Sequence, residues 1–320
     1  MSELFTRVAR PAILAASRSH RLRRTAERMP VTRKVVHRFV PGETTDAALN
    51  SFAALRRSGR FVSIDYLGED VTDSDAADAT VHAYLGLLDA LGDRDDSTTD
   101  PKPLEVSVKL SALGQALPKD GAKIALENAH TICAKARDVG AWVTVDAEDH
   151  TTTDSTLSIV RDLRVEFDWL GTVLQAYLRR TRADCAEFAA AGARIRLCKG
   201  AYDEPATVAF RDADDVTDSY LTCLRILMDG RGYPMVASHD PEIIAAVPEM
   251  VRESGRGTAD FEYQMLYGIR DTEQQRLAAE GNHVRVYVPF GTQWYGYFVR
   301  RLAERPANLT FFLRALAERR

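Results

Sequence analysis

Two adjacent arginines near the end of the sequence have the type and spacing of an anion-binding pair. They lie in the segment YFVRRLAER (297–305), and on a helix Arg300 and Arg301 would share a face with Tyr297 because residues three and four apart are neighbours. Two adjacent guanidinium groups repel each other, and each matches a carboxylate in shape and charge. The pair therefore indicates either an anion site or a solvated face lined with salt bridges.

Further polar residues lie near the C-terminal ends of short apolar segments. They are Lys109 in VSVKL, Asp146 in VTVDA, Gln175 in TVLQAY, Arg196 and Lys199 in IRLCKGAY, His239 in VASH, and Tyr287 in VRVYVPF. Cations outnumber acids in this set, which favours an anionic ligand that carries a carboxylate, a pyrophosphate or both.

The segment KGAY (199–202) places a glycine after a lysine, where backbone amides can approach a phosphate closely. The sequence shows no Ser–His–Asp arrangement, no pair of glutamates suited to hydrolysis, and no spacing typical of metal ligands. We therefore expect no bound metal, and we expect an organic cofactor to supply the reactive chemistry.

The overall composition is that of a soluble globular protein. The chain has 320 residues, 45% hydrophobic and 28% charged, and no stretch approaches the roughly 18 to 20 apolar residues that span a bilayer. Its four cysteines are far apart, which argues against a disulfide framework or structural zinc. This cysteine usage fits a reducing compartment, so we expect the protein in the cytoplasm.

Charge is unevenly distributed along the chain. Residues 1–40 hold ten Lys or Arg residues against Glu3 and Glu27, whereas the remainder carries a net charge of −12. Such a basic arm can contact an anionic membrane surface or nucleic acid, or dock on the acidic body of its own chain. An arginine-rich mitochondrial leader is a further interpretation.

Strand-like and helix-like segments alternate along most of the sequence. Eight segments have strand character: 61–67, 104–110, 141–147, 171–177, 193–199, 233–239, 261–267 and 284–290. Helical periodicity occurs between them, for example over 75–91, 122–140 and 214–230, and Gly140 and Gly230 mark helix ends. This count predicts an α/β fold, a (β/α)8 TIM-type barrel; a doubly wound sheet is the alternative, but no GxGxxG follows the first strand.

We divide the chain into a basic helical N-terminal arm (1–58) and a catalytic barrel domain (59–320) whose C-terminal helix closes the active site. The acidic stretch 93–103 and the stretch 254–260 are predicted surface loops. Active sites of such barrels lie at the C-terminal ends of the strands, where the polar residues above would meet.

Eight motifs occur in order, one per strand or helix: VSVKLSALG, VDAED, LQAYLRR, RLCKGAY, ASHD, FEYQMLYG, VYVPFGT and YFVRRLAER. Together they resemble the motif series of the proline dehydrogenase family, FAD-dependent enzymes that oxidise L-proline. The resemblance extends from about residue 37 to near the C-terminus. The compact length is similar to the bacterial monofunctional form, because no aldehyde dehydrogenase domain follows.

The resemblance implies a substrate site. Arg300 and Arg301 would bind the proline carboxylate together with Lys109. The residues implied around the pyrrolidine ring are Tyr202, Leu266, Tyr287 and Tyr297. Glu69 would pair with Arg300 and gate the site.

The resemblance also implies a flavin site. Gln175 and Arg196 would lie near the isoalloxazine ring, with Arg196 on the N5 side. The other implied cofactor contacts are Ala147, Lys199, Gly200, Ala201, Ser238 and His239. Asp146, Arg196 and Tyr202 are the implied catalytic residues.

In the implied reaction, hydride passes from proline C5 to N5 of FAD, giving Δ1-pyrroline-5-carboxylate, the first step of proline catabolism. A quinone would then receive the electrons, which gives the basic arm a reason to contact the inner face of the cell membrane. A pyrroline-5-carboxylate dehydrogenase is the implied partner enzyme, and we expect no nucleic-acid partner.

Two positions depart from the family pattern. Asp203 stands where many relatives place Trp, which removes an aromatic contact to the flavin, and Ser238 replaces a commoner Thr. Two other interpretations remain open: another FAD-dependent barrel similar to methylenetetrahydrofolate reductase, and a non-catalytic barrel whose basic arm binds membrane or nucleic acid.

Overall fold

Eight parallel strands form a closed barrel in the computed structural model, which describes residues 36–92 and 101–304. The strands are β1 (Phe61–Tyr66), β2 (Leu104–Val108), β3 (Trp142–Val145), β4 (Gly171–Gln175), β5 (Arg194–Cys198), β6 (Tyr233–Ala237), β7 (Glu262–Leu266) and β8 (Val284–Phe290). Strand β1 pairs with both β2 and β8, which closes the sheet. The predicted (β/α)8 fold is confirmed, and every predicted strand is present within two residues at each end.

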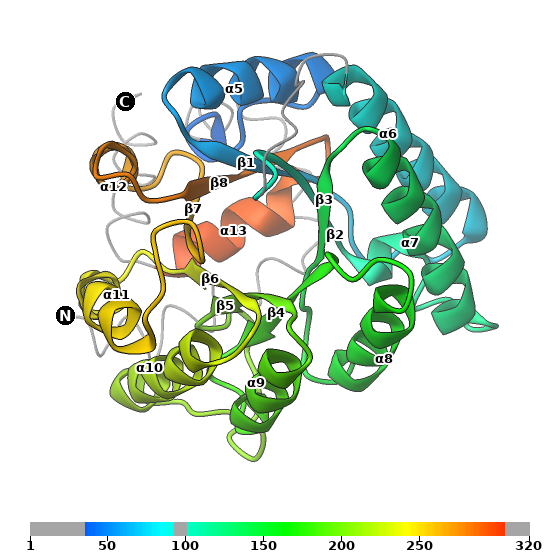
Figure 1. The fold of residues 1–320 in the computed structure, drawn as a ribbon. Helices are drawn as coiled ribbons and strands as arrows, with labels where there is room; N and C mark the ends of the chain where they lie inside the picture. Colours follow the sequence, from blue (N-terminus) through cyan, green and yellow to red (C-terminus); the bar gives the residue numbers. More distant parts are fainter. Residues whose placement is uncertain (1–35, 93–100, 305–320) are drawn as a thin grey trace, which may run out of the picture.

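Helices surround this barrel, as Figure 1 shows. They are α5 (Thr45–Arg57), α6 (Ser74–Gly92), α7 (Gly121–Asp138), α8 (Thr153–Arg164), α9 (Thr181–Ala190), α10 (Ala213–Asp229), α11 (Pro241–Ser254), α12 (Asp271–Ala279) and α13 (Trp294–Glu304), with a short 3-10 helix at Leu110–Leu113. Local sequence explains several ends: the side chains of Asp212 and Asp240 cap α10 and α11 by accepting hydrogen bonds from Asp214 N and Glu242 N.

The predicted helix stops lie where expected. Helix α7 ends at Asp138, and Gly140 follows with a φ of 73°, a left-handed conformation that favours glycine. Helix α10 ends at Asp229 and is capped by Gly230 in an extended conformation.

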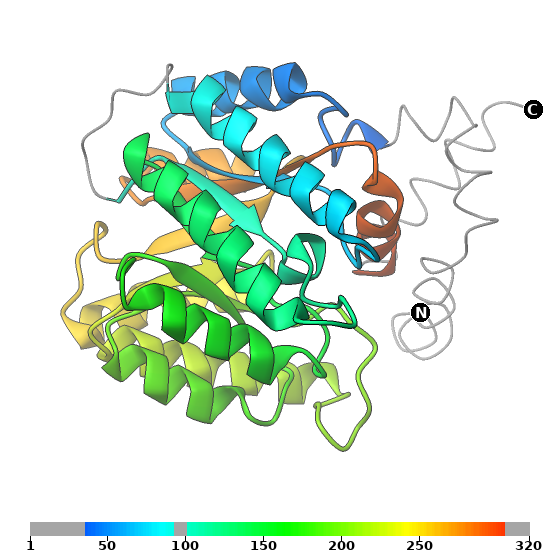
Figure 2. The same ribbon diagram turned by 90° about the vertical axis from the view of Figure 1, so that its right-hand side faces the viewer.

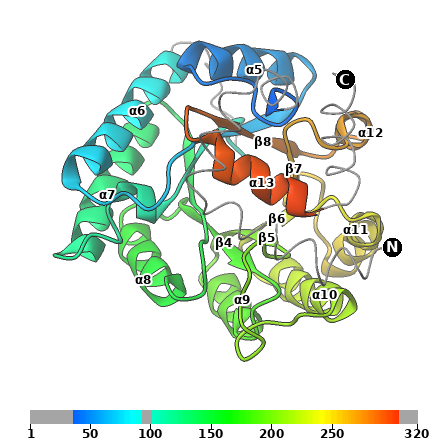
Figure 3. The ribbon, with the colours of Figure 1, turned by 180° about the vertical axis from the view of Figure 1, so that it is seen from behind.

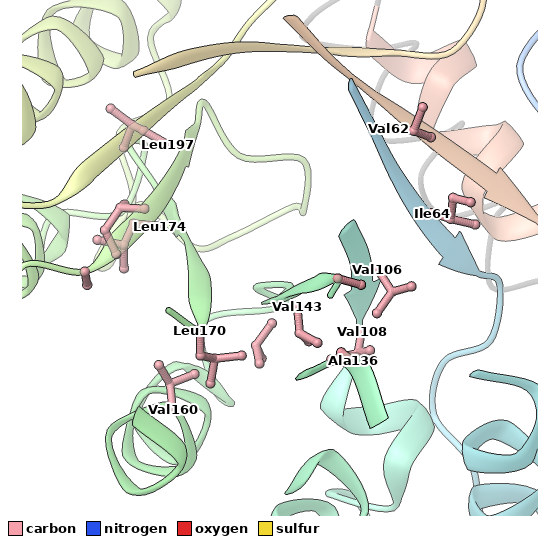
Figure 4. Packing of buried hydrophobic residues seen from close by; sticks show 14 of the residues in the cluster. Val62, Ile64, Val106, Val108, Ala136, Val143, Val160, Leu170, Leu174 and Leu197 are labelled. Atoms are coloured by element: carbon pink, nitrogen blue, oxygen red, sulfur yellow. The ribbon is translucent and has the colours of Figure 1, made fainter. Parts of the chain in front are cut away.

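Strand side chains divide between two environments. Apolar residues of the strands point outward and pack against the helices, forming the main hydrophobic core (Figure 4). Because side chains alternate along a strand, the residues between them point into the barrel. On β1, for example, Val62 and Ile64 belong to the apolar core, whereas Ser63 and Asp65 bond to polar groups of other strands. The barrel interior is therefore polar and charged.

Helix α13 lies across one end of the barrel (Figure 3), and Figure 2 shows it from the side at that same end. It follows β8 and therefore covers the C-terminal ends of the strands. Its apolar side chains form a second buried cluster with Val36, Phe39, Val40 and Leu67. Residues 36–40 thus anchor α13.

Part of the predicted N-terminal arm lies outside the described residues, namely 1–35, as do 93–100 of the predicted acidic loop. The described remainder of the arm contains α5, which packs against β1 and β8. The stretch 254–260 is a turn region, as expected for a surface loop. In the described parts of the chain, no helix has both the length and the apolar character needed to cross a membrane.

Candidate active site

A buried lysine occupies the centre of the polar cluster at the barrel mouth. Lys109, directly after β2, places its ammonium 2.6 Å from Asp65 Oδ2, 3.5 Å from Asp146 Oδ2 and 3.3 Å from the Tyr287 hydroxyl. The Tyr287 hydroxyl donates to Asp146 Oδ2 at 2.9 Å. Burial opposes the charged lysine, but attraction to Asp65 and Asp146 outweighs it and raises the Lys109 pKa. The two carboxylates therefore stabilise the charged form of Lys109.

Arg196 lies beside this cluster on β5 with all five of its N–H donors directed at protein acceptors. Its Nη2 donates to Glu105 at 2.6 Å and to Ser63 at 3.1 Å. Its Nη1 donates to Asp146 Oδ1 and to Ser107, both at 2.7 Å, and its Nε donates to Gln264 at 2.5 Å. To donate a hydrogen bond to a flavin atom, Arg196 would have to give up one of these five bonds. Its positive charge, in contrast, would act on a nearby flavin ring while all five bonds stay in place.

The arginine pair on α13 lies against the barrel rather than in solvent. The solvated-face interpretation is wrong, because the Arg300 side chain is 13% exposed and Arg301 is 8% exposed. Arg300 donates to both oxygens of Glu69, at 2.7 and 3.2 Å, so the expected ion pair is present. Burial alone would raise the Glu69 pKa, but attraction to Arg300 outweighs burial and lowers it.

Aromatic side chains accompany both arginines. The Arg301 guanidinium lies 4.9 Å from the Tyr297 ring centre, and the Arg300 guanidinium lies 5.9 Å from that of Tyr202. Leu266 is half-buried at the end of β7. The residues predicted to surround the substrate ring thus border the same mouth as the arginines.

The predicted cofactor residues follow the ends of β3 to β6. Those that are half-buried at the rim are Ala147, Lys199, Gly200, Ala201 and His239, whereas Gln175 and Ser238 are buried. The Gln175 amide donates to the Glu148 carbonyl at 2.8 Å, and Ser238 Oγ accepts from Asp240 N at 3.1 Å. His239 Nε2 accepts from Leu266 N at 2.9 Å.

The donor set of this rim fits a dinucleotide flavin. Lys199 keeps a half-buried ammonium at the rim, bonded to Asp240 at 2.7 Å and Thr217 at 2.8 Å. Gly200 has a φ of 113°, and a Cβ there would lie 2.3 Å from the Tyr177 ring, so only glycine fits. A cationic side chain beside a half-buried glycine backbone suits a pyrophosphate, and buried Arg196 suits a ring that gains negative charge.

Asp203, the departure from the family pattern, lies in the connection from β5 to α10. It is exposed and pairs with Arg211 at 3.0 Å.

Two acidic residues of the mouth were missed by the sequence prediction. Asp65 ends β1 in FVSIDYL and carries the same signal as Asp146, a lone acid near the C-terminal end of an apolar segment. Glu148 lies in the loop after β3, where no strand or helix periodicity can predict whether its side chain faces the barrel mouth. Only its contacts reveal it: Ser111 donates to it from Oγ at 2.5 Å and from N at 3.0 Å.

Glu148 makes stability depend on pH near neutrality. Burial raises the Glu148 pKa to about 7, against the opposing effects of Ser111 and Lys109. The folded state therefore holds this proton more tightly than the unfolded state. The stabilisation of the fold that comes from the protonated Glu148 is fully present below the unfolded pKa of roughly 4.3 and is lost as pH rises through 7. Glu148→Gln, which keeps a neutral partner for Ser111, should be more stable than the parent at pH 8 by on the order of 2 kcal/mol, and the difference should vanish below about pH 4.

Urea unfolding of both proteins across this pH range measures the difference. Glu249→Gln, at an exposed glutamate on α11, is the matched control and should leave the pH dependence unchanged. Parallel stability curves for Glu148→Gln and the parent would show that Glu148 does not titrate in this range.

Comparison with known proteins finds similar sequences over most of the chain. The family model described as Proline dehydrogenase matches residues 48–314. The chain is 38% identical to "Proline dehydrogenase 1" of Bacillus subtilis over 288 residues, 90% of this chain and 92% of that protein. It is 40% identical to "Proline dehydrogenase" of Deinococcus radiodurans over 284 residues, 88% of this chain and 90% of that protein.

A solved structure shares the fold. It is the crystal structure of proline utilization A (PutA) from Bdellovibrio bacteriovorus inactivated by N-propargylglycine, with a TM-score of 0.77 and 26% identity. The match covers 85% of this chain and 33% of that longer chain.

Proposed function

Since this chain belongs to the proline dehydrogenase family, we propose that it oxidises L-proline to Δ1-pyrroline-5-carboxylate with FAD as its cofactor. The observation that carries the proposal is that Lys109 and Arg300 converge on Glu69: Arg300 bonds to this carboxylate, and the positive charges of both residues lower its pKa. Bound at this mouth, FAD would supply the two-electron oxidant for hydride removal from proline C5 to flavin N5, and a quinone would be the final electron acceptor.

The protein's own contribution begins with binding of the substrate carboxylate. The charged side chains of the barrel interior already pair with one another: Glu262 with Arg285 at 2.7 Å, and Glu105 with Arg194 at 2.5 Å and Arg196 at 2.6 Å. A further carboxylate at the mouth therefore needs added positive charge. We assign that role to the clamp, which consists of Lys109, Arg300 and Arg301.

Arg300 also takes part in closure of the site. Its ion pair with Glu69 links α13 to the loop after β1, so the pair holds the helix over the mouth in the described arrangement. We assign Glu69 and Arg300 the role of a gate that excludes water when closed.

The remaining side chains orient and enclose the substrate. We assign the ring wall to Tyr202, Leu266, Tyr287 and Tyr297. Asp146 holds both the Tyr287 hydroxyl and Arg196, at 2.9 and 2.7 Å, so it aligns the wall with the buried cation. Arg196 is buried and positive, which favours a reduced ring that carries negative charge.

We assign FAD to the rim formed by Ala147, Gln175, Lys199, Gly200, Ala201, Ser238 and His239. Lys199 and the backbone at Gly200 would hold the pyrophosphate. Residues 59–320 form the catalytic domain in this proposal, and residues 1–58 form an arm that contacts the inner face of the cell membrane. The product would pass to a pyrroline-5-carboxylate dehydrogenase.

Anaerobic titration of the purified protein with L-proline, followed in visible light, tests the function. The expected result is a flavin absorbance that proline bleaches and that NAD(P)H leaves unchanged. Bleaching by NAD(P)H alone would support a folate reductase, and a colourless protein with salt-sensitive binding to lipid or DNA would support a non-catalytic barrel.

Asp65→Asn should weaken proline binding. The Asp65 carboxylate is fully buried and orients the Lys109 ammonium, and asparagine keeps the shape while removing the charge. We expect the KM for proline to rise about tenfold, the loss of one charge-assisted hydrogen bond, while the flavin spectrum stays unchanged. Steady-state kinetics with a soluble dye as acceptor measures it, and an unchanged KM would separate Lys109 from substrate binding.

Deletion of residues 1–30 should lower activity with quinone in membrane vesicles more than activity with a soluble dye. The basic side chains of this segment are attracted to anionic lipid, and the attraction is screened by salt. The ratio of quinone activity to dye activity, measured at low and high salt, shows how much residues 1–30 contribute to the reaction at the membrane. Equal losses with both acceptors would show that the segment does not serve the membrane reaction.

A further inference from the structure

A buried glutamate joins three loops of the barrel mouth. Glu204 lies in the connection from β5 to α10, two residues after Tyr202, and is 3% exposed. Its Oε1 accepts from His150 N at 2.9 Å and from the Tyr177 hydroxyl at 3.3 Å, and its Oε2 contacts His150 Nδ1. The single carboxylate therefore ties together the segments that follow β3, β4 and β5.

Tyr177 connects Glu204 to the segment Lys199–Ala201. Its ring fills the space beside Gly200, where a Cβ would lie 2.3 Å from a ring carbon. Its backbone N donates to the Lys199 carbonyl at 2.9 Å. The hydroxyl bond to Glu204 orients the ring, and the ring in turn limits the backbone path at Gly200.

Arg211 secures the far side of the same loop. Its Nη1 donates to the Glu204 carbonyl and to Asp203 Oδ1. Arg211 thus fixes the Glu204 backbone, while the Glu204 carboxylate bonds to His150 and Tyr177 on the other two loops. Glu249, an exposed glutamate on α11, lies outside this network and offers a matched control for the same glutamate-to-glutamine change.

We propose that Glu204 is a positioning residue for the cofactor: through Tyr177 and Gly200 it keeps the Lys199–Ala201 backbone in the shape that receives the FAD pyrophosphate. The inference rests on the proposed function, since it requires that FAD occupy this rim. A loop whose backbone is already ordered loses less conformational freedom when the ligand binds, and so holds it longer.

Flavin release from the full-length holoenzyme tests the proposal. Free FAD is more fluorescent than bound FAD, so release after dilution can be followed directly, while circular dichroism at the same temperature monitors the fold. Glu204→Gln should release flavin about tenfold faster than the parent, the consequence of weakening charge-assisted hydrogen bonds that shape the site. Tyr177→Phe, which keeps the ring and removes one bond, should accelerate release about threefold. Glu249→Gln should release flavin at the parent rate.

Two results would overturn the inference. One is a folded Glu204→Gln protein that releases flavin at the parent rate; the other is equal acceleration by Glu249→Gln. If Glu204→Gln does not fold, an unchanged release rate for Tyr177→Phe likewise rejects it. Failure of the proposed function gives a different result: the parent protein itself would hold no flavin, or proline would not bleach it.

Discussion

Arg301→Ala should raise the KM for proline by roughly 10- to 100-fold, because a charge-assisted hydrogen bond to a carboxylate contributes on the order of 1.5–3 kcal/mol. Arg301 is buried on α13 beside the Tyr297 ring, and its positive charge acts on the Cys198 thiol at the end of β5, which places the guanidinium on the barrel side of the helix. The neighbouring Arg300 is held by Glu69, and the interior acids are paired with interior cations. Loss of Arg301 therefore removes charge that the substrate carboxylate requires.

The flavin should be unaffected by this change. The cofactor rim follows β3 to β6, whereas α13 follows β8, so the bound flavin spectrum should match that of the parent. Steady-state kinetics and a visible spectrum of the same preparation measure the two effects. Arg301→Lys, which keeps the charge and loses the planar donor pair, should lie between the parent and the alanine variant.

Arg252→Ala, at an exposed arginine on α11, is the control and should keep the parent KM. Retained proline affinity in Arg301→Ala would remove this residue from the clamp.

Arg196→Met should have the largest effect on stability and should also change the flavin. Arg196 is fully enclosed between Glu105 and Asp146, so methionine would leave buried carboxylates without one of their cations. Removing one partner of a buried ion pair costs about 3–5 kcal/mol of unfolding free energy. Loss of positive charge beside the flavin should also lower its reduction potential, by about 30 mV for each 1.4 kcal/mol of lost stabilisation.

Arg194→Met separates the two effects. Arg194 lies on the same strand, two residues before Arg196, and is also buried. It pairs with Glu105 at 2.5 Å, as Arg196 does. Its other bonds are to Met235 and the Trp169 carbonyl, and none is to Asp146. We expect Arg194→Met to be destabilised like Arg196→Met while its flavin potential stays at the parent value. Urea unfolding and equilibration with redox dyes measure the two quantities. An unaltered potential in folded Arg196→Met would contradict its placement near N5.

The charge pattern of the interior explains why these two arginines differ in expected function. Two ion pairs lie in the interior, Glu262 with Arg285 and Glu105 with Arg194, and the charge of Arg285 also acts on Glu105, so the charges of these four residues balance. Asp65, Lys109 and Asp146 form the next group, at the ends of β1 to β3. Arg196 contacts both groups, through Glu105 and Asp146. Replacing Arg196 should therefore alter the charge balance at the mouth as well as in the interior.

The fold and the composition of the mouth were determined by local sequence. Alternation of apolar and polar residues sets each strand, and its polar residue near the C-terminal end is carried to the mouth by the barrel topology. Lys109, Asp146 and Tyr287 could be predicted there because each position depends only on its own strand. The amphipathic pattern around Arg300 and Arg301 likewise predicted helix α13.

Only the tertiary structure decided which of these groups bond to one another. Lys109 pairs with Asp65 across 44 residues of sequence, and Arg196 pairs with Glu105 across 91. Such contacts depend on strand register and on barrel closure, which no local pattern encodes. The same holds for Glu204, whose partners His150 and Tyr177 lie 54 and 27 residues away on other loops. Periodicity assigns a residue to an element and a face, but the packing of all eight strands and their loops selects its partners.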